Sequence, residues 1–170
     1  MAEAASRTES FGFGKWIVAG AALVSAMVGL AWLGTRPVAA PAAEVHAYLE
    51  ANRKKPGVTE TASGLLIEVV KQGEGASPKT GDAVRLHYEG RLADGTVFDS
   101  SVARGQPAVF GVGDLIPGMN EALTLMKPGG RYRIVIPPAL AYGDKGAGGV
   151  IPPNAPLEFQ IELLQVATQP

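Results

Sequence analysis

Two aspartates and two serines stand close to aromatic residues in residues 88–101, which read YEGRLADGTVFDSS. A serine nucleophile needs a general base that is itself oriented by a third group. The two histidines are His46, which falls in a spacer, and His87, which falls on the polar face of an expected strand. Neither serine lies in a G-x-S-x-G turn, and Asp94 precedes a glycine as turn residues do. The stretch therefore does not predict a hydrolytic triad.

Phosphate and metal sites are not indicated either. Residues 113–118 have the G-x-x-x-x-G spacing of a phosphate-binding loop, but Met119 and Asn120 stand where a lysine and a hydroxyl residue are required. Two isolated histidines and scattered carboxylates lack the spacing of a metal site. We therefore expect no cofactor.

A set of apolar and aromatic residues surrounds the polar turns of the chain. Its members are Tyr88, Phe98, Phe110, Leu115, Ile116, Tyr142, Ile151 and Phe159. Such residues form the core of most proteins, and they also line most ligand pockets. Their pattern alone leaves both interpretations open.

Length and composition allow one ordinary core. The chain has 170 residues, of which 46% are apolar, which suits one compact domain with an extension. Lys and Arg number 15 against 16 Asp and Glu, so no basic surplus favours nucleic acid as a partner. The sequence has no cysteine, which excludes disulfides and thiolate catalysis.

An uncharged run at residues 16–33, WIVAGAALVSAMVGLAWL, has about the length of a helix that spans a bilayer. A tryptophan stands at or near each end, and Arg7 and Lys15 precede the run, which predicts that the C-terminal part lies outside the cytoplasm. The alternative is a cleaved signal peptide, because the small residues of VAAPAA follow. The length of the run and the charge of Arg36 favour a retained anchor. We therefore expect a single-pass inner-membrane protein with its domain in the periplasm, or a secreted one if the segment is cleaved.

The chain divides into four parts on this interpretation. They are an N-terminal tail at 1–15, the transmembrane helix or signal anchor at 16–33, a Pro/Ala linker and short helix at 34–57, and a folded domain at 58–170. The short helix is indicated by helical spacing of Val45, Tyr48 and Leu49 and ends before Pro56.

Strands dominate the folded domain, because from Ser63 onward apolar residues recur with a period of two. The segments that indicate strands are 64–70, 84–92, 132–136 and 157–163, with a turn at 93–96 that leads into a strand at Phe98. One helix is expected at 117–126, entered through Pro117. This pattern predicts an α+β fold, a bent antiparallel sheet wrapped around one short helix and preceded by a transmembrane helix. Residues 137–156 are rich in proline and glycine, and we expect a functional loop without regular structure.

Four motifs together identify a family. At VRLHYEGRLADGTVFDSS, VFGVGDLIPGMNEAL, AYGDKGAGGVIPP and LEFQIELL the sequence closely resembles the FKBP-type peptidyl-prolyl cis-trans isomerases, over about residues 59–166. The run EANRKKPGVTETASGLLIEVVKQGEG is similar to the entry into that domain in bacterial macrophage infectivity potentiator-like members. Those members often carry a helical dimerisation region, in place of which this chain has the predicted membrane segment.

The resemblance implies a hydrophobic pocket between the sheet and the helix that receives a prolyl peptide. By position, its lining would be Tyr88, Phe98, Asp99, Phe110, Leu115, Ile116, Met119, Tyr142, Ile151 and Phe159. It also implies that the Ile116 amide and the Tyr142 hydroxyl donate hydrogen bonds to carbonyls of the substrate or of a macrolide. Asp99 would pair with Arg104 and hold the pocket wall, without taking a proton from water. The catalytic residues would thus be Asp99, Tyr142 and Ile116.

Three residues depart from the family pattern. Met119 replaces a common tryptophan of the pocket floor, Ala108 replaces a frequent aromatic residue, and Ala147 stands where some relatives have histidine. The resemblance therefore does not fix the pocket depth or the affinity for macrolide inhibitors. The expected partners are proline-containing polypeptides and the membrane. The alternative function is a non-catalytic FKBP-like chaperone or partner-binding module tethered to the membrane.

Overall fold

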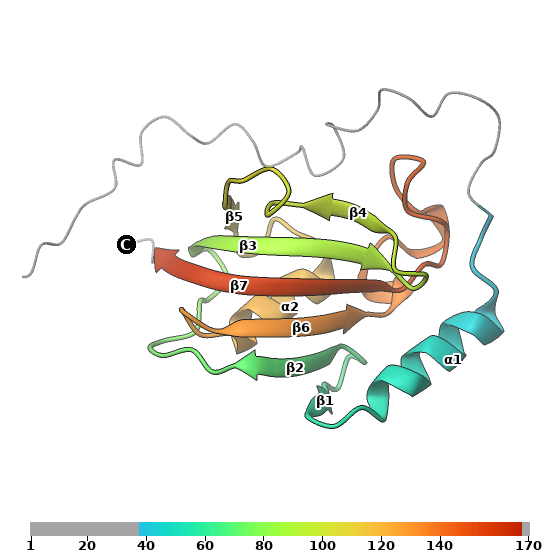
Figure 1. Cartoon of the computed structure of the whole chain (residues 1–170), viewed down its shortest axis with the longest axis horizontal. Coiled ribbons are helices and arrows are strands. Elements are labelled where there is room, and N and C mark those ends of the chain that lie inside the picture. The colour runs from blue at the N-terminus through green and yellow to red at the C-terminus, as the bar shows by residue number, and fades with distance from the viewer. Residues whose placement is uncertain (1–37, 168–170) are drawn as a thin grey trace, which may run out of the picture.

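The computed structural model of the chain describes residues 38–167. The elements in chain order are α1 (Ala42–Arg53), β1 (Val58–Glu60), β2 (Leu66–Lys71), β3 (Ala83–Leu92), β4 (Val97–Ser100), β5 (Ala108–Gly111), α2 (Pro117–Leu125), β6 (Arg131–Ile136), two one-turn 3-10 helices η1 (Pro138–Leu140) and η2 (Gly143–Lys145), and β7 (Leu157–Ala167). Figure 1 shows their arrangement, with α1 beside the end of the sheet that carries β1.

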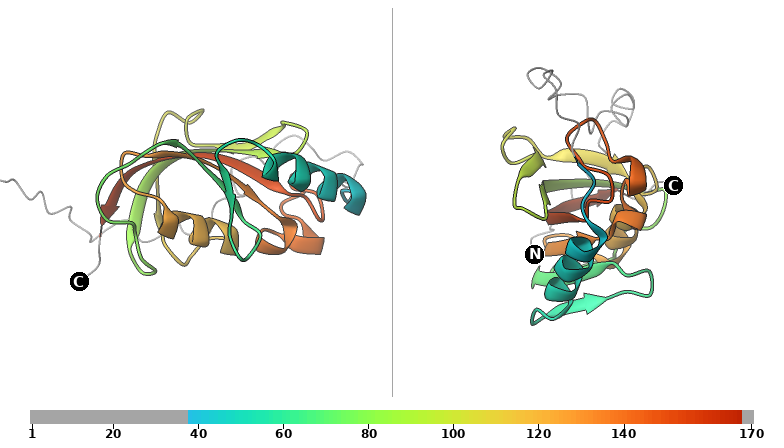
Figure 2. Two further views of the ribbon diagram at one scale, coloured as in Figure 1. Left: turned by 90° about the horizontal axis from the view of Figure 1, so that it is seen from below. Right: turned by 90° about the vertical axis from the view of Figure 1, so that its right-hand side faces the viewer.

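The strands of this part of the chain form one antiparallel sheet in the order β1-β2-β6-β7-β3-β4. β7 pairs with β3 over the whole length of β3, from Ala83 to Leu92. β4 and β5 share the other edge of β3, because β4 pairs with its second half and β5 with its first. The sheet arches over α2, which lies against its concave face (Figure 2).

Alternation along the strands decides which residues face α2. In β3, Val84, Leu86 and Tyr88 are buried while Arg85 is exposed, as the period of two predicts. The core joins this face to α2; its fully buried large side chains include Leu65, Leu66, Leu86, Leu123, Met126, Ile134, Ile136, Leu157 and Leu163. The predicted α+β fold with an antiparallel sheet is confirmed.

A glycine allows α2 to approach the sheet closely. A Cβ atom added at Gly118 would lie 2.4 Å from Cγ2 of Ile136 on β6. No side chain fits at that distance in a packed interior. The absence of a side chain at this position therefore sets the spacing between α2 and β6, and with it the width of the space beside them.

Some elements differ from the sequence expectations. β1 and β5 were not predicted, because strands of three and four residues show too little alternation to be recognised. The β6–β7 loop, residues 137–156, was expected to lack regular structure, and this was wrong for η1 and η2. There, local contacts such as Leu140 N–H to the Pro137 carbonyl, 3.0 Å, close single 3-10 turns.

The predicted membrane segment at 16–33 lies outside the described residues. Within residues 38–167, no helix is both long and apolar enough to cross a bilayer.

Candidate functional site

An open hollow of about 510 Å³, counting the solvent at its mouth, is lined mostly by apolar side chains. The lining residues are Leu86, Tyr88, Phe98, Asp99, Phe110, Leu115, Ile116, Met119, Tyr142, Ile151 and Phe159. The structure thus brings together the ten residues that the resemblance assigns to a pocket. Leu86 is the eleventh, and sequence reasoning missed it, although alternation along β3 puts it on the same face as Tyr88.

Aromatic rings form one wall of this pocket. Phe98 of β4 and Phe159 of β7 meet edge to face, with ring centroids 5.5 Å apart and an interplanar angle of 90°, a favourable geometry for aromatic pairs. The rings pack over Gly90 of β3, where an added Cβ would lie 2.5 Å from Phe98 and 2.8 Å from Phe159. Tyr88 continues the wall towards Phe110, with centroids 5.8 Å apart. The absence of a side chain at Gly90 therefore permits the ring packing.

A polar group of three residues closes one edge of the pocket. The Tyr88 hydroxyl donates to the Asp99 carboxylate, and Arg104 forms an ion pair with the same carboxylate. Arg104 also donates to the Tyr88 hydroxyl at 2.8 Å, and its guanidinium carbon lies 5.5 Å from the centroid of the Tyr88 ring. Burial and the hydrogen bond to Asp99 raise the pKa of Tyr88 to about 12. The Asp99 carboxylate is therefore engaged by two donors and holds the wall in place.

Two donors at the pocket are free to bind a ligand. The Tyr142 hydroxyl has no hydrogen-bond partner within residues 38–167, and burial with the nearby charge of Asp99 raises its pKa. The phenol therefore stays protonated at neutral pH and can donate. The amide of Ile116, directly before α2, likewise lacks an acceptor in the described part of the chain, as is usual at a helix N-terminus.

Asn120 of α2 holds the loop that carries Leu115 and Ile116. Its Oδ1 accepts hydrogen bonds from the amides of Gly113, 2.9 Å, and Leu115, 3.3 Å, and its Nδ2 donates to the Leu115 carbonyl, 2.7 Å. Asn120 is thus a positioning residue. This role could not be recognised from the sequence, because the three contacts depend on the loop folding back over the first turn of α2.

The β6–β7 loop supplies the remaining side of the pocket. Ala147 and Ile151 form a bridge within it, and Tyr142 lies between its two 3-10 turns. A Cβ atom at Gly146, which has φ 62°, would lie 2.2 Å from the Ile151 carbonyl oxygen. Glycine is therefore required where the loop crosses itself, and this crossing presents Tyr142 and Ile151 to the same hollow.

The residues that depart from the family pattern lie around this site. Met119 is part of the pocket lining, where an unbranched thioether forms a deformable apolar surface. Ala108 lines a second hollow next to Arg104, with Gln106 and Pro107. Ala147 takes part in the bridge with Ile151.

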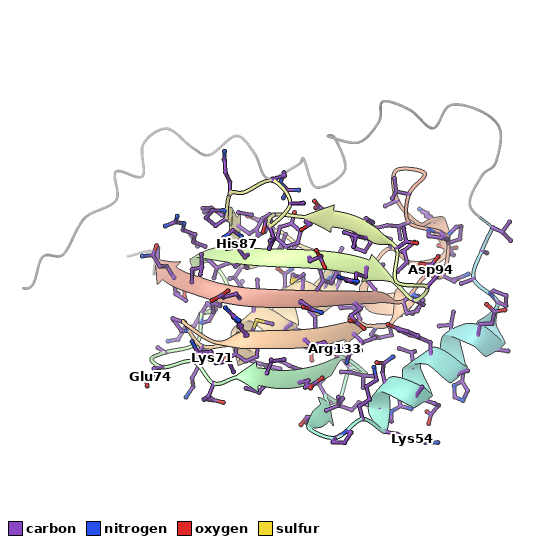
Figure 3. All side chains as sticks on the ribbon, in the orientation of Figure 1. Lys54, Lys71, Glu74, His87, Asp94 and Arg133 are labelled. Carbon is purple, nitrogen blue, oxygen red and sulfur yellow. The ribbon has the colours of Figure 1, made fainter. Side chains whose placement is uncertain are left out.

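A histidine and a serine do meet, outside the pocket lining. Nδ1 of His87 lies 3.1 Å from Oγ of Ser101, a contact that sequence reasoning missed. Ser101 is 0% exposed, and its hydroxyl accepts from the Tyr88 amide at 2.8 Å. Figure 3 labels His87 on β3. A buried hydroxyl that is committed to the backbone cannot attack a substrate, so the pair is not a nucleophilic site.

Comparisons with known proteins agree with this site. The sequence profile of the FKBP-type peptidyl-prolyl cis-trans isomerases matches residues 74–164. The FKBP-type 22 kDa peptidyl-prolyl cis-trans isomerase of Escherichia coli (strain K12) is 58% identical over 127 residues, covering 75% of this chain and 62% of that protein. The peptidyl-prolyl cis-trans isomerase Mip of Coxiella burnetii is 53% identical over 120 residues, covering 71% of this chain and 52% of the relative.

A solved structure shows the same architecture. The crystal structure of FkpA from Escherichia coli superimposes with a TM-score of 0.73 and 44% identity, covering 75% of this chain and 60% of that chain. The chain thus spans about half to three-fifths of the length of these relatives. Since the profile match alone extends over more than half of the 170 residues, the chain belongs to the FKBP-type peptidyl-prolyl cis-trans isomerase family.

Proposed function

We propose that this chain is a peptidyl-prolyl cis-trans isomerase, which accelerates rotation about Xaa-Pro bonds in unfolded or folding polypeptides. The observation that carries the proposal is the pocket itself, an apolar hollow walled by aromatic rings with the free hydroxyl of Tyr142 and the free amide of Ile116 beside it. Membership of the family supports the same conclusion.

Rotation about a prolyl bond needs no acid, base or nucleophile, because no covalent bond is made or broken. The barrier is the loss of amide resonance, about 18–20 kcal/mol. A planar amide is more dipolar than a twisted one and is better hydrated. Transfer into an apolar pocket therefore raises the planar state relative to the twisted state, and a site that binds the twisted state more tightly accelerates the reaction.

The residues of the pocket have separate tasks in this mechanism. The prolyl ring packs among Tyr88, Phe98 and Phe159, which exclude water. The Tyr142 hydroxyl and the Ile116 amide bind carbonyls of the peptide and hold it on either side of the rotating bond. Asp99 acts on the substrate only through the wall that it stabilises and the field it exerts at Tyr142.

The energy required is within reach of such a site. Uncatalysed exchange takes about 10–100 s, so millisecond turnover requires about 5–7 kcal/mol of differential stabilisation. Desolvation of one amide together with two hydrogen bonds in a pocket of low dielectric supplies energies of this order.

The proposal is tested by measuring cis-trans exchange of a short proline-containing peptide with the full chain. We expect catalysed exchange, strongly reduced in Phe98→Ala and unchanged in the matched variant Val97→Ala, because Val97 is 44% exposed and lies outside the pocket lining. Peptide binding without accelerated exchange would contradict catalysis and support the non-catalytic binding module instead.

We propose further that macrolide inhibitors enter the same pocket. Their carbonyls would use the same two donors, at Tyr142 and Ile116. Met119 on the floor and Ala108 beside the rim set how deeply and how tightly they bind. Competition between a macrolide and the peptide substrate in the exchange assay tests this, and the absence of competition at saturating macrolide would contradict it.

We propose that residues 16–33 anchor the chain in the inner membrane with the isomerase domain in the periplasm, where its clients would be folding proteins. The uncharged run and the preceding Arg7 and Lys15 support this orientation. A reporter that is active only outside the cytoplasm, fused to the C-terminal end, should be active and sediment with membranes. Activity in the soluble periplasmic fraction would indicate cleavage instead.

A further inference from the structure

The segment that precedes the isomerase domain contacts it at several places, and two of these contacts lie on the strands and the loop that lead to the pocket. We call residues 38–53, which comprise α1 and the four residues before it, the N-terminal arm. In Figures 1 and 2 the arm runs beside the β6–β7 loop and then along the end of the sheet. The β6–β7 loop carries two pocket residues, Tyr142 and Ile151.

The first contact is a partly buried polar cluster on the face of the sheet that points away from α2. The Tyr48 hydroxyl donates to the Glu158 carboxylate at 3.1 Å, and Arg133 donates to the same carboxylate at 2.6 Å. Arg133 also donates to Oδ1 of Asn52, which is 2% exposed, and lies 3.5 Å from the Glu68 carboxylate. Figure 3 labels Arg133 on β6, beside α1.

This cluster determines the position of α1 on the sheet more than it contributes to the stability of that contact. The most buried residue of α1 is the polar Asn52, while Val45, Tyr48 and Leu49 on the same side of the helix are half-buried. Hydrogen bonds are directional and satisfied here in one arrangement, whereas buried ion pairs add little net stability. The contact therefore specifies the position of the arm.

The second contact leads to the pocket. The Ala40 amide donates to the carbonyl of Pro153 at 3.1 Å. The next residue, Asn154, has φ 58° and donates from its amide to the Gly143 carbonyl at 2.7 Å. Gly143 directly follows Tyr142. Two backbone hydrogen bonds thus connect the arm to Gly143, the chain neighbour of the pocket residue Tyr142.

The two contacts bracket one short segment. Pro153 accepts from Ala40 and Glu158 accepts from Tyr48, and the pocket residues Ile151 and Phe159 lie just outside the two ends of this segment. We propose that the N-terminal arm is a positioning element of the prolyl pocket, which holds the end of the β6–β7 loop and thereby orients Tyr142 and Ile151. This inference rests on the proposed isomerase function for its effect on catalysis, but its structural part does not.

The structural part is tested in the full chain with Ala40→Pro, which removes the amide that donates to the Pro153 carbonyl. Ala39→Pro is the matched control, because the Ala39 amide has no acceptor within residues 38–167. We expect the Asn154 amide to exchange with solvent about tenfold faster in Ala40→Pro than in Ala39→Pro, since its local protection is lost. Equal exchange rates in the two variants would overturn the proposal, whatever the isomerase activity.

The catalytic part is tested with Tyr48→Phe, which removes one hydrogen bond of the cluster and keeps the ring. We expect KM for a prolyl peptide to rise about threefold with little change in kcat, an effect that His46→Ala on the exposed side of α1 does not produce. In the Tyr142→Phe background the rise should shrink, because coupled residues are not additive. Full additivity would show that the arm does not act through Tyr142, and would overturn this part.

Discussion

At the scale of single residues, the pocket separates the groups that hold the substrate from those that hold the wall. Tyr142 presents a hydroxyl with no partner in the described structure, whereas the hydroxyl of Tyr88 is engaged by Asp99 and Arg104. Both rings form part of the apolar lining, but only the hydroxyl of Tyr142 is available to donate to a substrate carbonyl. Substitutions at these tyrosines should therefore have different consequences.

Tyr142→Phe keeps the ring and removes the donor. We expect kcat/KM for a prolyl peptide to fall about 2- to 10-fold, the value of one hydrogen bond of about 0.5–1.5 kcal/mol. Because the pKa of Tyr142 is raised by burial and by Asp99, the wild-type rate should stay level through neutral pH and fall only above the ordinary tyrosine range. A pH profile of the exchange rate measures this. An identical alkaline fall in the variant would assign the titration to another group.

Asp99→Ala removes the acceptor shared by Tyr88 and Arg104. We expect a larger loss of turnover than in Tyr142→Phe, because two donors lose their partner and the wall loses its fixed geometry. Arg104→Ala should reproduce part of the loss, since it leaves the Tyr88 hydroxyl bound to Asp99. If turnover in Asp99→Ala equals that of the wild type, the proposed role of this carboxylate is wrong.

At the scale of elements, the pocket is assembled where the loop before α2 and the β6–β7 loop meet the sheet. The loop before α2 carries Leu115 and Ile116, and the asparagine of the first turn of α2 fixes its backbone through three hydrogen bonds. Since a free amide must be aimed to within hydrogen-bonding distance, the orientation of this loop matters as much as the presence of Ile116.

Asn120→Ala tests the importance of this loop. We expect peptide affinity to fall about three- to tenfold, because the amide of Ile116 is no longer held in position. Leu125→Ala is a suitable control, since Leu125 is 48% exposed on the same helix. Isothermal titration with a prolyl peptide gives the affinities. A loss that is equal in both variants would indicate a general weakening of α2 instead.

The same scale shows what could be predicted from sequence. β3 and β7 alternate over many residues, so their faces were predicted correctly. The pocket residues came from the family resemblance, since alternation alone cannot distinguish a pocket from a core. The hydrogen bonds of Asn120 to the loop before α2 could not be predicted, because they depend on how that loop folds. The contact of Tyr48 with Glu158 could not be predicted either, because the two residues lie 110 positions apart in the sequence.

At the scale of the whole molecule, the half-buried Tyr48 and the buried Tyr88 make the stability of the fold depend on pH in the alkaline range. Burial and the charge and hydrogen bond of Glu158 raise the pKa of Tyr48 to about 12, and burial and Asp99 raise the pKa of Tyr88 to about 12. Both values exceed the ordinary value of 10.0. The folded state therefore keeps protons that the unfolded state releases first.

The sign of the effect on stability follows. Between about pH 10 and pH 12 the unfolded chain binds fewer protons than the folded chain, so the free energy of unfolding decreases as pH rises. We expect Tyr48→Phe and Tyr88→Phe each to reduce this alkaline loss, by an amount on the order of 1 kcal/mol. Urea unfolding at pH 9 and pH 11 measures it. Parallel losses in the wild type and both variants would contradict the assignment.

The direction in which β7 runs has a practical consequence for handling the protein. β7 starts at Leu157, beside the N-terminal arm, and ends at Ala167, at the opposite end of the sheet (Figure 1). A dye, bead or affinity handle attached after β7 is thus remote from the arm and from Pro153. Force on the same handle attached ahead of Val38 would be transmitted through the Ala40–Pro153 hydrogen bond to the β6–β7 loop, which bears Tyr142. Single-molecule or surface-based binding measurements should therefore reflect the unperturbed pocket when the protein is immobilised through its C-terminal end.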